Sequence, residues 1–132
     1  SLGGWRGWSG VVSSVGVGLV DIERFRRSLE RTPSMRFRLF TEHELDDLAA
    51  RADPVPGLAA RFAAREAVMK SLGVGLGAFG FHEVWVRRHS SGRPDLVVDG
   101  RAAHLASRAG VSRWHLSLTH DEKSAVAYVV AE

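Results

Sequence analysis

The sequence predicts an α+β domain in which an antiparallel sheet packs on one central helix. Residues 58–72 form the predicted helix, because this stretch is rich in alanine and contains neither glycine nor proline. Residues 113–120 alternate between apolar and polar side chains, and residues 125–130 return as a β-branched run after a short polar turn. These two runs predict a hairpin, and antiparallel hairpins with one long helix are typical of the α+β class.

The other segments add one more hairpin and several shorter helices. Residues 81–88 and 95–98 flank a Ser-Ser-Gly-Arg-Pro turn, which favours a second hairpin. The remaining predicted elements are a strand over 11–20, a helix from Ile22 to before Pro33 with Asp21 as its N-cap, a short helix from the Thr41–Glu44 capping box to about Ala52, a loop over 53–57, and a helix over 101–109 closed by Gly110.

The central helix has two kinds of face. One face is predicted to belong to the core and carries large apolar side chains at helical spacing: Leu58, Phe62, Met69 and Leu72. A second set contains only alanines, namely Ala59, Ala63 and Ala67. Small side chains let another element approach closely, so we expect a neighbour to pack tightly there.

Composition restricts the class of protein. At 132 residues the chain is long enough for one domain, which we assign to residues 11–132; the glycine- and tryptophan-rich residues 1–10 are interpreted as a flexible extension or an expression remnant. There are no cysteines and no apolar run of membrane-spanning length, so the cytoplasm is the expected location. The net charge is +3, carried by 16 arginines and two lysines, which indicates an anionic partner. A basic RNA-binding domain is an alternative supported only by charge, because no nucleic-acid motif occurs.

A charged cluster precedes a glycine-rich turn. Glu66 and Lys70 lie four residues apart on the central helix, with Arg61 and Arg65 on preceding turns, and Gly73-Val74-Gly75-Leu76-Gly77 follows. Arginine and lysine pair with phosphates, a glycine-rich backbone approaches them, and a carboxylate can hold a divalent cation. The alternatives are an ordinary surface pair for Glu66 and Lys70 and a helix C-cap for Gly73.

The stretch Arg-Phe-Ala-Ala-Arg-Glu-Ala-Val-Met-Lys-Ser-Leu-Gly, residues 61–73, resembles the signature of the holo-acyl-carrier-protein synthases, the small phosphopantetheinyl transferases. That family reads Arg-[Phe/Trp]-Ala-Ala-Lys-Glu-Ala-x-x-Lys-Ala-Leu-Gly. The resemblance continues from about Val15 to the end, through a Gly-Arg-Pro turn at 92–94 and a closing His-Leu-Ser-Leu-Thr-His motif that begins at His115. It implies the phosphopantetheinyl transferase fold, assembled as a homotrimer with active sites at subunit boundaries.

The resemblance also implies a reaction and a site. The 4′-phosphopantetheine arm would pass from coenzyme A to a serine of an acyl carrier protein, with Mg²⁺ held by Glu66. Lys70 and His115 would act on the phosphates. The resemblance implies neither a nucleic-acid partner nor a membrane. Coenzyme A would be bound by Arg61, Arg65, Lys70, Gly73, Gly75, Gly92, Arg93, Pro94 and His115. The carrier would dock on Arg24, Arg27 and Arg31, which share one helix face, and on Arg38; from the residues alone this face could equally be a solvated surface.

One position departs from the family. The family's first motif carries an aspartate that is the second metal ligand, and Gly18 stands at that position. Asp21 matches a later glutamate of the motif, and on a continuous strand positions 18 and 21 face opposite ways. The alternative function is therefore a catalytically impaired homologue that binds carrier protein or coenzyme A. On this interpretation Gly18→Asp would restore the metal site.

Overall fold

The structure is a computed structural model that describes residues 12–132, so the interpretation of residues 1–10 lies outside the described residues. Its main sheet has the strand order β1-β5-β4, and both pairs are antiparallel. These strands are β1 (Ser14–Asp21), β4 (Trp114–His120) and β5 (Ser124–Ala131). The predicted α+β class with an antiparallel sheet on a central helix is confirmed.

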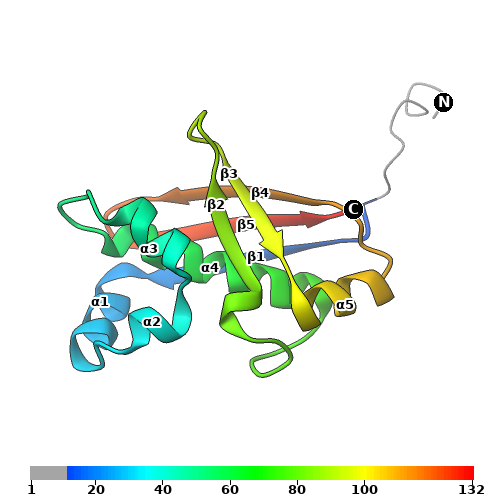
Figure 1. Ribbon diagram of the computed structural model, residues 1–132, viewed down its shortest axis with the longest axis horizontal. Helices are drawn as coiled ribbons and strands as arrows, with labels where there is room; N and C mark the ends of the chain where they lie inside the picture. Colours follow the sequence, from blue (N-terminus) through cyan, green and yellow to red (C-terminus); the bar gives the residue numbers. More distant parts are fainter. Residues whose placement is uncertain (1–11) are drawn as a thin grey trace.

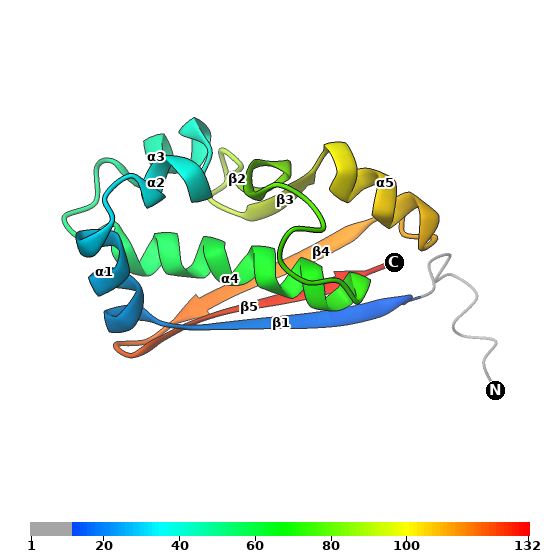
Figure 2. The same ribbon diagram turned by 90° about the horizontal axis from the view of Figure 1, so that it is seen from below.

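The central helix α4 (Val55–Leu72) forms the middle of three layers. The main sheet covers one side of α4, and a two-stranded hairpin of β2 (Val84–Arg88) and β3 (Pro94–Val98) lies on the other side (Figure 2). Leu58 and Met69 are buried, as predicted. Because elements pack on opposite sides of α4, polar residues of this helix are also enclosed, among them Arg61 and Arg65.

The alanine face of α4 receives β1 at very short range. A Cβ atom built on Gly16 would overlap the carbonyl oxygen of Ala67, and one built on Gly18 would overlap that of Ala63. The predicted close approach is therefore correct, and it needs glycine on the strand as well as alanine on the helix. Without side chains between them, the two backbones lie nearly in contact along two turns of α4.

Three short helices cover one end of the molecule and a fourth follows the hairpin (Figure 1). They are α1 (Ile22–Arg31), α2 (Met35–Leu39), α3 (Glu42–Leu48) and α5 (Gly100–Arg108). Asp21 caps α1, because its carboxylate accepts a hydrogen bond from the Arg24 N–H at 2.9 Å. Thr41 and Glu44 form the predicted capping box of α3.

Several boundaries differ from the prediction. The central helix starts at Val55 rather than Leu58, because proline is tolerated in the first turn of a helix, where Pro56 lies. The predicted loop over 53–57 is therefore shorter than expected. Helix α2 was not predicted, α3 ends at Leu48, and residues 81–83 form a 3-10 turn (η2) rather than the start of a strand. No helix within residues 12–132 is long and apolar enough to cross a membrane.

Candidate active site

Glu66 is a half-buried carboxylate on α4 with an unsatisfied oxygen. Its Oε1 atom is buried and has no hydrogen-bond partner among residues 12–132. Burial raises the pKa of Glu66 above the ordinary carboxyl value, and the charge of Lys70 one turn later opposes this rise. An unpartnered buried carboxylate oxygen is costly, so Glu66 is suited to a cationic ligand. We therefore treat it as the centre of the candidate site.

A cavity of about 510 Å³ opens beside Glu66. It lies where the end of β1 meets α1, and Asp21 and Arg24 line it together with Glu66. Asp21 is the last residue of β1, pairs with Ser124 and lies on the strand face opposite Gly18, as alternation predicts; because α1 begins at the next position, it nevertheless borders the cavity. Sequence reasoning set Asp21 aside on that alternation; its role as N-cap at a strand–helix junction was the signal that could have placed it here.

The glycine turn after α4 is partly structural. Gly73 has a left-handed backbone with φ of 68°, and its N–H donates to helix carbonyls as the C-cap. The C-cap alternative for Gly73 is thus confirmed, and its N–H is already used. Gly75 is exposed, and nothing lies within 4 Å of the position of a Cβ atom there. Lys70 is exposed at the same end of the helix, so Lys70 and Gly75 remain open to a ligand.

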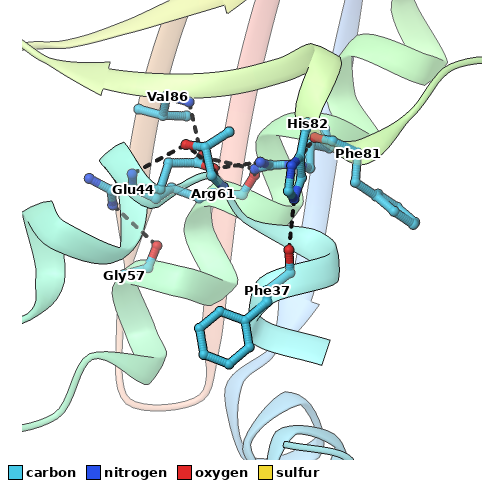
Figure 3. A network of polar contacts seen from close by, with 9 residues as sticks. Phe37, Glu44, Gly57, Arg61, Phe81, His82 and Val86 are labelled. Atoms are coloured by element: carbon cyan, nitrogen blue, oxygen red, sulfur yellow. Dashed lines mark hydrogen bonds and ion pairs between the residues drawn. The ribbon is translucent and has the colours of Figure 1, made fainter. Parts of the chain in front are cut away.

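Arg61 and Arg65 were expected to meet phosphates, and this prediction is wrong for the chain as folded. Arg65 is fully buried and pairs with Glu44, with its Nη2 atom 2.5 Å from Oε1 of Glu44. Arg61 is 2% exposed and donates to the Gly57 carbonyl (Figure 3). Both guanidinium groups therefore hold the interior together rather than facing a ligand.

Glu44 is the acceptor at the centre of this buried network. Besides Arg65, it accepts hydrogen bonds from the N–H groups of Thr41 and Val86, and so joins α3 and β2 to α4. A fully buried carboxylate needs such partners, because an unpaired buried charge is strongly destabilising. The network fixes the helix turn that carries Glu66, since Arg65 is its neighbour in the chain.

The predicted coenzyme A residues near the C-terminus gather in a second cavity. Arg93, Pro94 and His115 all line a cavity of about 520 Å³. His115 Nε2 lies 3.1 Å from Oε1 of Glu132, and the His115 side chain is exposed. Gly92 makes the tight β2–β3 turn with φ of 86°. Sequence reasoning missed His89, which lines this cavity beside Arg93.

The two cavities have no lining residue in common. Glu66 lies by the β1 edge of the sheet, whereas His115 is on β4, at the opposite edge. The neighbours of His115, Trp114 and Leu116, pack into the core beside α4, so His115 points to the outer face of the sheet. One chain therefore brings Arg93 and His115 together but does not join them to Glu66.

The predicted arginine face is present on α1. Arg24, Arg27 and Arg31 are exposed, as is Arg38 on α2. Arg26 is different, because it binds Asp53 at 2.7 Å and ties α1 to the start of α4. Arg24 also lines the Glu66 cavity, so the basic face and the candidate site are continuous.

Metal binding by this chain would depend on few protein ligands. Within residues 12–132 no group of three or more His, Cys, Asp or Glu side chains is arranged to hold a metal ion. Gly18 contributes no ligand, and its Cβ direction is filled by the Ala63 carbonyl. Glu66 does fit a cation, because Oε1 is buried without a partner.

Comparisons with known proteins show the family to which the chain belongs. A family model described as the 4′-phosphopantetheinyl transferase superfamily matches residues 14–129. A holo-[acyl-carrier-protein] synthase of Micrococcus luteus is 47% identical over 124 residues, which covers 92% of this chain and 93% of that protein. A Streptomyces avermitilis protein of the same name is 48% identical over 122 residues, covering 92% and 98%.

Solved structures give the same result. The holo-[acyl-carrier-protein] synthase of Neisseria meningitidis superposes with a TM-score of 0.82 at 30% identity, covering 92% of this chain and 99% of that one. A Bacillus anthracis holo-(acyl-carrier-protein) synthase in complex with coenzyme A (3′,5′-ADP) gives 0.76 at 27% identity, covering 93% and 98%. The chain therefore belongs to the 4′-phosphopantetheinyl transferase superfamily, with holo-[acyl-carrier-protein] synthases as its relatives.

Proposed function

We propose that this chain transfers the 4′-phosphopantetheine arm of coenzyme A to a serine of an acyl carrier protein. Family membership supports the reaction, and the observation that carries the site is the unpartnered carboxylate of Glu66 in a cavity bordered by exposed arginine. The proposal involves neither nucleic acid nor a membrane, and it assigns the activity to the cytoplasm, where coenzyme A is found.

In this reaction the serine oxygen forms a bond to the β-phosphorus of coenzyme A. The bond from that phosphorus to the bridging oxygen breaks, and adenosine 3′,5′-bisphosphate leaves. Lys70 is exposed beside Glu66 and neutralises charge that moves to the leaving group. The serine proton passes to Glu66 or to water; burial raises the pKa of Glu66, which makes it a stronger base than an ordinary carboxylate.

Glu66 is also the proposed ligand for Mg²⁺. No donor in the part of the chain that the structure describes reaches its buried Oε1 atom, which fits a residue whose partner is a bound cation. When bound, Mg²⁺ supplies charge neutralisation at the pyrophosphate oxygens. Glu66 would hold the ion at a fixed position, because α4 is packed between two layers and is therefore rigid.

The carrier is proposed to dock on the α1 arginine face. Acyl carrier proteins are named in the relatives, and acidic side chains would pair with Arg24, Arg27, Arg31 and Arg38. Arg24 belongs both to this face and to the Glu66 cavity. A carrier that lies along α1 would therefore present its serine close to Glu66.

Coenzyme A is proposed to use the second cavity as well, through Arg93, Pro94 and His115 and with Gly92 shaping the turn. Because Glu66 lies at the other edge of the sheet, the full site would form between subunits of a homotrimer. The exposed outer face of the sheet supports such a contact: Val15, Leu19 and Tyr128 are more than half exposed there. His115 borders this apolar face, and Leu19 borders the Glu66 cavity.

A catalytically impaired homologue is the second candidate function. The observation that favours it is the packing at Gly18, where no carboxylate side chain fits between β1 and α4. Such a chain would bind carrier protein or coenzyme A, or assemble with active subunits, without efficient transfer.

The test is a mass spectrum of an apo carrier protein incubated with this protein, coenzyme A and Mg²⁺. We expect a mass gain of one phosphopantetheine arm with the wild type, and no gain with Glu66→Gln, because that change removes the anionic oxygen and keeps the shape of the side chain. Glu122→Gln, at an exposed turn residue, is the matched control and should retain transfer. Transfer by Glu66→Gln at the wild-type rate would remove Glu66 from the site, and no transfer by the wild type would favour the impaired homologue.

A further inference from the structure

His115 and Glu132 meet on the outer face of the main sheet. The Nε2 atom of His115 lies 3.1 Å from Oε1 of Glu132. His115 pairs with Val130 across β4 and β5, and Glu132 comes two residues after Val130, so both side chains project from the same face. The two residues are 17 positions apart in the chain, so the contact depends on the pairing of the two strands.

Glu132 is the more firmly held member of this pair. Its N–H donates to the Arg113 carbonyl at 2.9 Å, and its carbonyl accepts from the N–H groups of Ser112 and Arg113 at 2.8 and 3.1 Å. The Glu132 side chain is 17% exposed, against 47% for that of His115. The carboxylate therefore stands on a fixed backbone, and His115 is the partner whose orientation has more freedom to lose.

The bond to Glu132 selects one orientation of the His115 ring. An ionised carboxylate only accepts hydrogen bonds, so Nε2 carries a proton and donates it to Glu132. The terminal torsion of histidine is otherwise broad and roughly two-fold, so an exposed ring without a partner would sample both orientations. With Nε2 engaged, a ligand in the second cavity has to bind His115 through Nδ1. Glu132 does not line that cavity, so it acts on a ligand there through His115.

We propose that Glu132 is a positioning residue, which orients the His115 imidazole so that Nδ1 is presented to a phosphate of coenzyme A in the second cavity. This inference rests on the proposed function, since it takes His115 as a coenzyme A residue. A protonated imidazole donates from both nitrogens, so the ring is then held by the carboxylate at Nε2 and by the phosphate at Nδ1. A ring that is ordered before the ligand arrives does not have to be ordered on binding.

The test is a double-mutant cycle on coenzyme A affinity, measured by calorimetric titration of the full chain. Glu132→Met removes both acceptor oxygens and keeps a side chain of similar length. We expect it to weaken coenzyme A binding about three- to tenfold, which corresponds to the cost of ordering one side chain. In a His115→Ala background the same change should have little effect, because Glu132 acts through the imidazole. A loss of the same size in both backgrounds would mean a merely structural role and would overturn the proposal.

Arg113→Met is the matched control, because it removes the other contact of the same carboxylate oxygen. Nε of Arg113 lies 3.5 Å from Oε1 of Glu132, and Arg113 does not line the second cavity. Its side chain is 66% exposed, so this pair should contribute little and coenzyme A affinity should stay close to that of the wild type. If Arg113→Met weakened binding as much as Glu132→Met, Glu132 would act through the arginine and the positioning role would be refuted.

The outcomes separate this inference from the proposed function. If His115→Ala binds coenzyme A like the wild type, the assignment of His115 fails, and the role of Glu132 fails with it. If His115→Ala weakens binding and Glu132→Met does not, only the role of Glu132 is overturned. Thermal unfolding checks that each variant folds. Glu132→Ser, which is too short to reach the imidazole, is a second truncation, and wild-type affinity in a folded Glu132→Ser chain would also count against the proposal.

Discussion

Glu66 and Arg65 are neighbours in the chain with opposite environments. Arg65 is enclosed and its charge is balanced by Glu44, whereas Glu66 borders a cavity with an oxygen that nothing in the described chain satisfies. The buried pair stabilises the packing of α3 on α4, and removing one member alone would leave a buried charge. The unsatisfied carboxylate costs stability, and it lies where we propose that the cation binds.

The first expected consequence concerns pH. Because burial raises the pKa of Glu66, the folded chain binds this proton more tightly than the unfolded chain. Stability from this site is therefore fully present below the ordinary carboxyl pKa and is lost as pH rises through the raised value. In metal-free buffer near pH 7, Glu66→Gln should resist urea better than the wild type, and the difference should shrink to nothing in acid.

Urea titrations at several pH values measure this difference. Glu122→Gln is the control and should follow the wild type at every pH, since Glu122 is exposed. Adding Mg²⁺ should narrow the gap, because a ligand stabilises only the folded chain that binds it. Identical midpoints for wild type and Glu66→Gln at pH 7 would mean that the carboxylate is well solvated.

Residue identity alone did not separate buried from open charges. Helix α4 carries three basic residues at helical spacing, Arg61, Arg65 and Lys70, and of these only Lys70 is exposed. The partner of Arg65 is Glu44, 21 positions earlier, and sequence periodicity contains no signal for such a pair. The motif at 61–73 predicts roles for both Glu66 and Lys70; the structure leaves Glu66 half-buried beside the cavity and Lys70 exposed, and their roles stay predictions.

Among elements, β1 and α4 depend on each other most closely. Gly18→Ala should lower the free energy of unfolding by about 1–3 kcal/mol or more, because the added methyl overlaps the Ala63 backbone. Gly18→Asp should be at least as destabilising, so it is not expected to restore a metal site. Urea unfolding followed by circular dichroism measures both changes.

Gly75→Ala is the control for that experiment. Gly75 has no positive φ and nothing within 4 Å of its Cβ position, so stability should change by less than about 1 kcal/mol. A Gly18→Ala chain as stable as the wild type would show that β1 and α4 separate easily.

The elements that were predicted well have strong local signals. The capping box predicted the start of α3, alternation predicted β4, and a β-branched run predicted β5. Helix α2 was missed because it has only five residues and no side-chain cap. The alanines of the central helix predicted that another element would pack closely on it. They did not predict that this element is β1, or that the contact needs glycine at positions 16 and 18.

At the scale of the whole molecule, charge is distributed unevenly. Among residues 12–132, Arg24, Arg27 and Arg31 on α1 form no ion pair, unlike Arg26, and Arg24 borders the Glu66 cavity. The second cavity lies across the sheet. The resemblance offers candidate residues for both cavities, and their roles stay predictions. The separation of the two groups depends on strand order, which no local pattern determines.

The docking face is tested by Arg31→Glu. We expect carrier affinity to fall on the order of tenfold, about 1.4 kcal/mol, with a larger effect at low salt, and coenzyme A affinity to stay unchanged. Arg108→Glu, an equally exposed arginine at the end of α5, is the control and should not affect the carrier. Calorimetric titration with an apo carrier measures the affinity of each variant. Equal carrier affinity of Arg31→Glu and Arg108→Glu would mean that the α1 arginines are only a solvated surface.

The contact of β1 with α4 also limits which side chains can occupy the inner face of the strand. A side chain at position 16 or 18 would meet helix backbone before it could reach a ligand. Side chains of β1 can therefore reach the Glu66 cavity only from its last residues, Leu19 to Asp21, where the strand leaves the helix.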